Sequence, residues 1–256
     1  MDNLKMLLHN HQLAPYSFCK LKRLYVNRCK NLINIFPPNM LRRLQNLEEL
    51  EIWNCNFVEE VFEIRGVNAN EICDTISTQL RVLRLYNLPK LKHVWSLDLQ
   101  AILTFQNLHT VTVFYCKILK SIFPVSVAKS LEQLESLTIH DCCLEEIVAL
   151  EEGVETTIKF VFPRITSLYL ASLPELKYFY PGKHILEWPL LKRLMIMNCD
   201  KVKIIASNEL SFQERDELAG HHVQIQQPLF PIEKVWICTC LFVNMYMTLA
   251  SVIIIK

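Results

Sequence analysis

Apolar residues recur along this chain in one short pattern that appears seven times. The clearest copy runs Leu21-x-x-Leu24-x-Val26-x-x-Cys29-x-x-Leu32-x-x-Ile35. The first part of the copy alternates apolar with variable residues, which is the period-2 pattern of a strand with one buried face. Each copy therefore predicts one short strand followed by a turn. The other copies begin at Leu47, Leu80, Leu108, Leu134, Ile165 and Leu191, and a degenerate eighth begins at Ile232.

A unit of this length cannot bury its own apolar face, so neighbouring units must stack on one another. The pattern predicts an α/β fold, a leucine-rich-repeat solenoid with a curved parallel sheet on the concave face. Short helices, 3-10 turns and loops are expected on the convex face, with helical spacing at 38–44 and 125–131. Residues 18–240 form this solenoid, 1–17 an N-terminal flank or partial repeat, and 241–256 an apolar tail. The tail is shorter than the roughly 20 residues that span a bilayer, so we expect a truncated repeat and no membrane anchor.

The copies also group in threes. The first and fourth end in Ile-Phe-Pro, and the third and sixth replace the cysteine by Leu-Pro. Matching copies start 87 (21 to 108), 87 (47 to 134) and 85 (80 to 165) residues apart, and one residue is missing after Cys142. A block of three repeats is therefore the unit of duplication. Longer insertions at 63–78, 150–160 and 207–228 are expected to be loops on the outer side.

Charge and composition exclude several classes of function. The chain has 27 Lys and Arg against 26 Asp and Glu, which gives no basic footprint for a nucleic acid. Its four glycines are too far apart for a phosphate-binding loop, so we expect no nucleotide or other cofactor. The N-terminus does not resemble a secretory signal, which favours a cytoplasmic location.

Six of the ten cysteines occupy the same place in the repeat: Cys29, Cys55, Cys116, Cys142, Cys199 and Cys240. A linear ladder of this kind does not converge on a tetrahedral zinc ion, so we expect no metal. Equivalent positions in stacked strands lie about 4.7–4.9 Å apart, so Cys29 with Cys55, or Cys116 with Cys142, could approach disulfide distance. In a reducing cytosol we expect free, buried thiols.

No arrangement of residues predicts catalysis. The pairs Glu59-Glu60 and Glu145-Glu146 could serve as acid/base dyads. Their recurrence at the same place in two triplets favours a solvated rim instead. His9, His11, His221 and His222 lie outside the regular strands and are expected to be solvated rather than metal ligands or pH switches. The chain is therefore not expected to be an enzyme.

The variable positions inside each strand point out of the concave face, where they can contact a partner. Aromatic, Met and Arg side chains are enriched there, as they are in interface hot spots. An alternative is that the aromatic residues stack on one another mainly to stabilise the ladder. The candidate partner-binding residues are Arg23, Tyr25, Trp53, Arg84, Tyr86, Phe114, His140, Tyr169, Arg193 and Met195.

Two segments carry a family resemblance: Leu47–Cys55, which reads LEELEIWNC, and Leu85–Trp95, which reads LYNLPKLKHVW. With the Ile-Phe-Pro endings, they resemble the leucine-rich repeats of plant coiled-coil nucleotide-binding disease resistance receptors. The resemblance implies that the repeats recognise pathogen effectors or host proteins, or regulate a nucleotide-binding switch domain that is absent from this chain. A competing class is the substrate adaptor of a ubiquitin ligase, but residues 1–16 are too short for the helical module that such an adaptor carries.

Overall fold

The computed structural model describes residues 19–36, 45–62, 76–95, 103–150, 156–202 and 234–238. Several predictions fall outside these ranges and stay predictions. They concern the convex helix at 38–44, most of the three insertions, Cys240, the loop histidines, and the segments at both ends of the chain.

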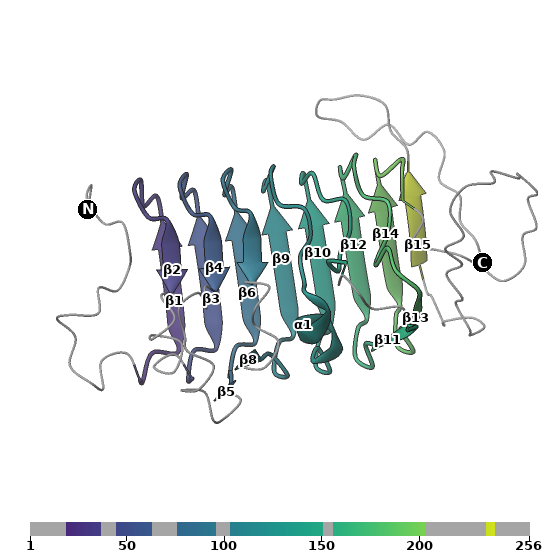
Figure 1. The fold of residues 1–256 in the computed structure, drawn as a ribbon, viewed down its shortest axis with the longest axis horizontal. Coiled ribbons are helices and arrows are strands. Elements are labelled where there is room, and N and C mark those ends of the chain that lie inside the picture. Colours follow the sequence, from purple (N-terminus) through teal and green to yellow (C-terminus); the bar gives the residue numbers. More distant parts are fainter. Residues whose placement is uncertain are drawn as a thin grey trace, which may run out of the picture.

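One long parallel sheet dominates the fold, and its strands follow one another in chain order (Figure 1). Every strand begins two residues after the start of a repeat, so the predicted solenoid is confirmed. The strands are β1 (Arg23–Asn27), β3 (Glu49–Trp53), β6 (Val82–Tyr86), β9 (Thr110–Phe114), β10 (Ser136–His140), β12 (Ser167–Ala171), β14 (Arg193–Met197) and β15 (Lys234–Cys238).

The core lies behind this sheet because alternate residues of each strand turn inward. Leu50 and Ile52 of β3, like Leu83 and Leu85 of β6, have no exposed surface. The same two positions are buried in β9, β10, β12 and β14. A continuous stack of Leu, Ile and Val therefore joins neighbouring repeats, as the sequence pattern predicts.

The turn after each strand depends on a left-handed residue. Among the described residues, seven that are not glycine have φ between 51° and 56°, and each comes directly after the last residue of a strand. The backbone N–H of this residue adds one more hydrogen bond to the parallel ladder with the next repeat. Asn54, for example, donates to the carbonyl of Tyr86 at 3.0 Å, and Asn87 to that of Phe114 at 2.9 Å. The seven residues are Arg28, Asn54, Asn87, Tyr115, Asp141, Ser172 and Asn198.

The cysteine that follows this residue completes the turn. The thiol of Cys55 donates to the carbonyl of Trp53 at 3.3 Å, and Cys142 and Cys199 make the equivalent bond at 3.3 and 3.2 Å. A small side chain with a weak donor fits this buried corner. Seven cysteines between Cys19 and Cys199 are free thiols.

The outer side differs from the expectation of helices, turns and loops. In the described residues it has one helix, α1 (Val125–Lys129), where 125–131 was predicted. Three small parallel sheets complete this side. They comprise β2 (Asn34–Phe36), β4 (Glu60–Phe62) and β7 (His93–Trp95); β5 (Ile76–Ser77) and β8 (Leu103–Thr104); and β11 (Ile158–Val161) and β13 (His184–Glu187). Two predicted loop insertions thus end in strands, because β5 and β11 pair with neighbouring repeats.

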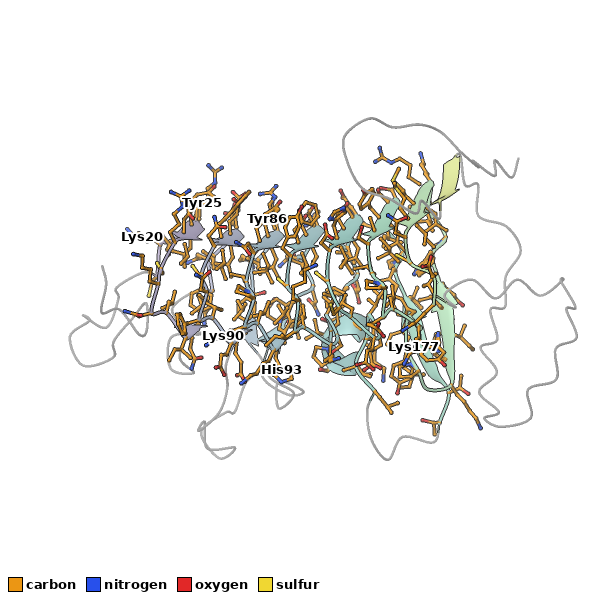
Figure 2. The ribbon with its side chains drawn as sticks, turned by 90° about the horizontal axis from the view of Figure 1, so that it is seen from above. Lys20, Tyr25, Tyr86, Lys90, His93 and Lys177 are labelled. Atoms are coloured by element: carbon orange, nitrogen blue, oxygen red, sulfur yellow. The ribbon has the colours of Figure 1, made fainter. Side chains whose placement is uncertain are left out.

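The outer pairing repeats one triplet later, which supports duplication of a three-repeat block. In the first triplet Phe36 pairs with Phe62, and in the second Phe123 pairs with Val148. The partner of Phe123 is displaced by 86 residues (62 to 148) rather than 87, which matches the residue missing after Cys142. Figure 2 shows the two sides of the solenoid, with Tyr25 and Tyr86 on one and Lys90, His93 and Lys177 on the other.

Candidate functional site

The strand register places the variable residues in three columns across the sheet. We call the surface that carries these columns the concave face. The column at the C-terminal ends of the strands consists of Asn27, Trp53, Tyr86, Phe114, His140, Ala171 and Met197. The middle column runs Tyr25, Glu51, Arg84, Thr112, Thr138, Tyr169 and Met195, and the third begins with Arg23 and Glu49 and ends on β14 with Arg193.

A group of paired charges occupies the first three strands of this face. The Arg84 guanidinium contacts the carboxylates of both Glu49, at 2.7 Å, and Glu51. Tyr25 donates its hydroxyl hydrogen to Glu49 at 3.0 Å, and the indole N–H of Trp53 donates to Glu51 at 3.1 Å. Arg84 is therefore already held by two carboxylates, and is not an unpaired cation awaiting a partner.

These contacts shift the pKa values of their members. Partial burial disfavours the charged form of Glu49, but hydrogen bonds from Arg84 and Tyr25 outweigh it, so the pKa of this carboxyl is lowered. The hydrogen bond to Glu49 raises the pKa of the Tyr25 hydroxyl. Glu49 thus stays ionised, and Tyr25 stays protonated, at neutral pH. Glu49 and Glu51 belong to this surface but were not among the candidate residues.

An unbroken row of rings runs along the concave face from β3 to β12. Trp53 stacks on Tyr86 with ring centroids 3.8 Å apart, and Tyr86 meets Phe114 edge to face at 5.1 Å. Phe114 lies 5.5 Å from His140, whose ring is 6.3 Å from that of Tyr169. The row changes column at Tyr169 because the next residue of its own column is the small, buried Ala171. Neighbouring rings therefore do contact one another, while Trp53 remains 36% exposed.

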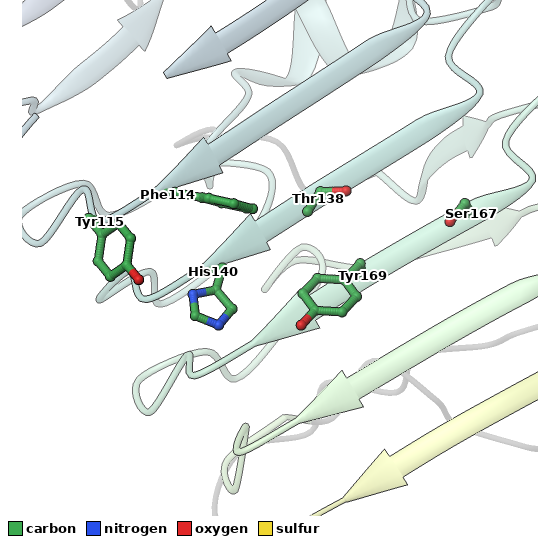
Figure 3. Close-up of a pocket in the computed structure, with 6 residues that line it drawn as sticks. All are labelled: Phe114, Tyr115, Thr138, His140, Ser167 and Tyr169. Carbon is green, nitrogen blue, oxygen red and sulfur yellow. The ribbon is translucent and has the colours of Figure 1, made fainter. Parts of the chain in front are cut away.

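A hollow of about 430 Å³ opens beside this row (Figure 3). It forms where Thr138 and Ser167, both small, lie among larger ring-bearing neighbours. Burial raises the pKa of Tyr169, so its hydroxyl stays protonated. The lining residues are Phe114, Tyr115, Thr138, His140, Ser167 and Tyr169.

Three residues of this hollow were not among the candidates: Tyr115, Thr138 and Ser167. Tyr115 lies outside the strand, at the left-handed position that precedes Cys116. The sequence could have indicated Tyr115, because the residues that precede the turn cysteines form a further column of their own. At the far end of the face, the candidates Arg193 and Met195 lie on β14, with Arg193 exposed and Met195 half-buried.

Only one member of each glutamate pair, Glu59 and Glu145, lies on the solvated rim that was predicted. Glu59 pairs with Lys92 at 2.7 Å, and Glu145 with Lys120 at 2.6 Å. Glu60 is only 6% exposed, because β4 carries it into the outer sheet. Burial raises the pKa of Glu146, whose carboxylate accepts the N–H of Leu150 at 3.1 Å. One member of each pair is thus packed against the outer side, and the two carboxylates do not share a site.

The described part of the chain contains neither a cluster of metal-ligating side chains nor a membrane-spanning helix. Across these residues, no three His, Cys, Asp or Glu side chains are grouped so that they could hold a metal ion. Nor does any helix in the same ranges have the length and apolar character needed to cross a membrane.

Comparison with known proteins agrees with this architecture. The family described as plant disease resistance protein RPS2-like, leucine-rich repeats, matches residues 1–143, more than half of the chain. The probable disease resistance protein At4g27220 of Arabidopsis thaliana is 32% identical over 74 residues, which are 28% of this chain and 8% of that protein. The chain thus matches less than a tenth of its relative's length, and no solved structure matches it. The repeats continue through β12, β14 and β15 beyond the matched residues, and the chain belongs to the RPS2-like leucine-rich repeats of plant disease resistance proteins.

Proposed function

We propose that the concave face is a protein-recognition surface in plant defence. Its ligand is a pathogen effector or a host protein, and the same surface can regulate a nucleotide-binding switch domain. The observation that carries the proposal is the ring row from Trp53 to Tyr169 on a rigid sheet. Aromatic side chains offer a large contact area at a small cost in conformational entropy, and they are enriched in hot spots.

Membership of the family supports this function, because leucine-rich repeats mediate protein–protein interactions through surfaces of stacked repeats. The row is also flanked on β1, β3 and β6 by paired charges, of which Arg23 is mostly exposed. An apolar centre with a polar rim is the usual anatomy of a protein interface. Resemblance to intracellular receptors supports a cytoplasmic location.

A double variant, Trp53→Ala with Phe114→Ala, tests the proposal. Both rings are removed from the row, while the buried strand residues behind them are unchanged. Binding of the chain to a panel of purified effectors and host target proteins is measured by biolayer interferometry, and thermal melting is measured in parallel. We expect at least a tenfold loss of affinity for any protein that the unmodified chain binds, since hot-spot truncations cost about 2 kcal/mol or more.

The matched control is Phe57→Ala with Ile118→Ala, which removes two apolar side chains, 43% and 42% exposed, that lie outside the three columns. This control should bind as the unmodified chain does. Equal losses of affinity in the two double variants would contradict the proposal. A large drop in the melting temperature of the Trp53/Phe114 variant would instead show that the row is structural.

A further inference from the structure

No lysine or arginine is among the residues that line the hollow beside the ring row. Four of its six lining residues bear hydroxyl groups: Tyr115, Thr138, Ser167 and Tyr169. None of these hydroxyls is bonded to another residue in the described ranges. Each can therefore offer its oxygen lone pairs to a bound group.

His140 adds a further acceptor. Its Nδ1 lies 2.6 Å from Oδ2 of Asp141. A carboxylate can only accept, so in the neutral imidazole Nδ1 carries the hydrogen and Nε2 keeps its lone pair. The other oxygen of Asp141 forms a long ion pair, 3.9 Å, with the exposed ammonium group of Lys117. The carboxylate of Asp141 thus directly contacts a residue that lines the hollow.

Two of the rings that line the hollow share one orientation. His140 and Tyr169 are nearly parallel, at 18°, and Figure 3 shows both turning a face the same way. Phe114 is inclined at 55° to His140 and forms a side of the hollow. Tyr115, which also lines the hollow, stands at 71° to His140. The face of an aromatic ring carries partial negative charge and attracts a cation.

We infer that this hollow receives an arginine side chain of the protein partner. A guanidinium group is planar, so it can lie flat on the face of Tyr169 or His140, and its five N–H donors match the surrounding acceptors. The charge of Asp141 favours a cation and opposes an acidic side chain. A lysine ammonium lacks the flat surface and is more strongly hydrated. The inference rests on the proposed function and identifies the chemistry of the ligand at this part of the face.

Short peptides test the inference without a known partner. The probe is acetyl-Gly-Arg-Gly-amide, and its neutral counterpart carries citrulline, which has the same shape as arginine without the charge. Binding to the full chain is followed by NMR of the aromatic ring signals. We expect saturable shifts of His140 and Tyr169, and affinity about two- to fivefold higher for the arginine peptide, as one exposed cation–π contact provides.

Two variants locate the binding. Tyr169→Ala removes the platform and should abolish the preference for arginine. Asp141→Asn keeps a residue that tolerates the left-handed backbone but removes the charge, and it should weaken the arginine peptide more than the citrulline peptide. Phe57→Ala is the control, because Phe57 is an exposed ring outside the three columns and its removal should have no effect.

Equal affinity for the two peptides, an absence of saturable shifts, or unchanged binding in Tyr169→Ala would overturn the inference. Preference for a peptide with glutamate in place of arginine would also overturn it. None of these results bears on the proposed function, which stands or falls with the Trp53/Phe114 variant. Conversely, the Trp53/Phe114 variant could bind proteins as well as the unmodified chain does, while the arginine peptide still binds at the hollow of the unmodified chain. That result would contradict the proposed function and leave the arginine site standing.

Discussion

At the scale of single residues, the turn after each strand shows what a repeat pattern can hide. Seven residues share a left-handed backbone, yet they include Arg28, Tyr115 and Ser172 as well as asparagines. Side chains with a Cβ pay roughly 1–2 kcal/mol in this conformation. The N–H to C=O bond that each of the first six makes to the next repeat compensates for this cost. Repeat geometry therefore overrides local preference at this position, and different residue types occupy it from one repeat to the next.

The buried turn cysteine leads to a prediction about pH. Burial raises the pKa of Cys55 to about 11, above its ordinary value of 9.0. The unfolded chain therefore ionises first as pH rises. The stability that comes from keeping this thiol neutral is complete below pH 9 and is lost between about pH 9 and 11, an effect of roughly 2–3 kcal/mol.

Cys55→Ala should therefore lose less of its free energy of unfolding than the unmodified chain between pH 8 and pH 11, measured by urea denaturation. Val58→Ala is the control, because Val58 is equally buried but does not titrate. It should be less stable at every pH and keep the original slope. Parallel curves for Cys55→Ala and the unmodified chain would rule out a contribution from this thiol.

At the scale of elements, the eight main strands and their columns follow from the sequence because period-2 alternation and the repeat together specify register. The outer strands do not. Segments such as Asn34–Phe36 are three residues long, too short for any periodicity, and they pair only because stacking brings them together. The candidate site shows the same division: its columns were predicted, while the two carboxylates on Arg84 depend on side-chain directions that no pattern encodes.

The outer strands bring together a second set of rings, which predicts where stability resides. Phe62 of β4 is 4% exposed and packs on Phe36, Trp95 and Phe105, with centroids 5.7, 6.1 and 5.3 Å away. Phe62→Ala should lower the free energy of unfolding by about 3–5 kcal/mol, because it removes a large side chain from a packed core. The measurement is urea denaturation followed by circular dichroism.

Phe57→Ala is the matched control in the same repeat. Phe57 is largely exposed, and Lys90 lies 4.2 Å over its ring, so the loss should be about 1 kcal/mol or less. Similar losses in the two variants would mean that the outer rings are not part of the core on which the repeats depend.

At the scale of the whole molecule, each strand of the long sheet bonds only to its two neighbours. Stability is then close to a sum over adjacent repeats, and damage should remain local. Several ion pairs also join one repeat to the next. Lys22 contacts Glu48 at 2.8 Å, and Lys201 contacts Glu175 at 2.7 Å. The hollow lies at the middle of this array, on β9, β10 and β12.

Ile139→Asp tests whether the array behaves in this way. Ile139 has no exposed surface and lies on β10, so an unpaired carboxylate there should cost several kcal/mol. Hydrogen exchange should rise most in β9, β10 and β12 and progressively less toward β1 and β14. Ile139→Val, which keeps the apolar surface, should leave the exchange pattern nearly unchanged. Uniform loss of protection in all the main strands would show a single cooperative unit, and the ring row would then have to be treated as part of one core.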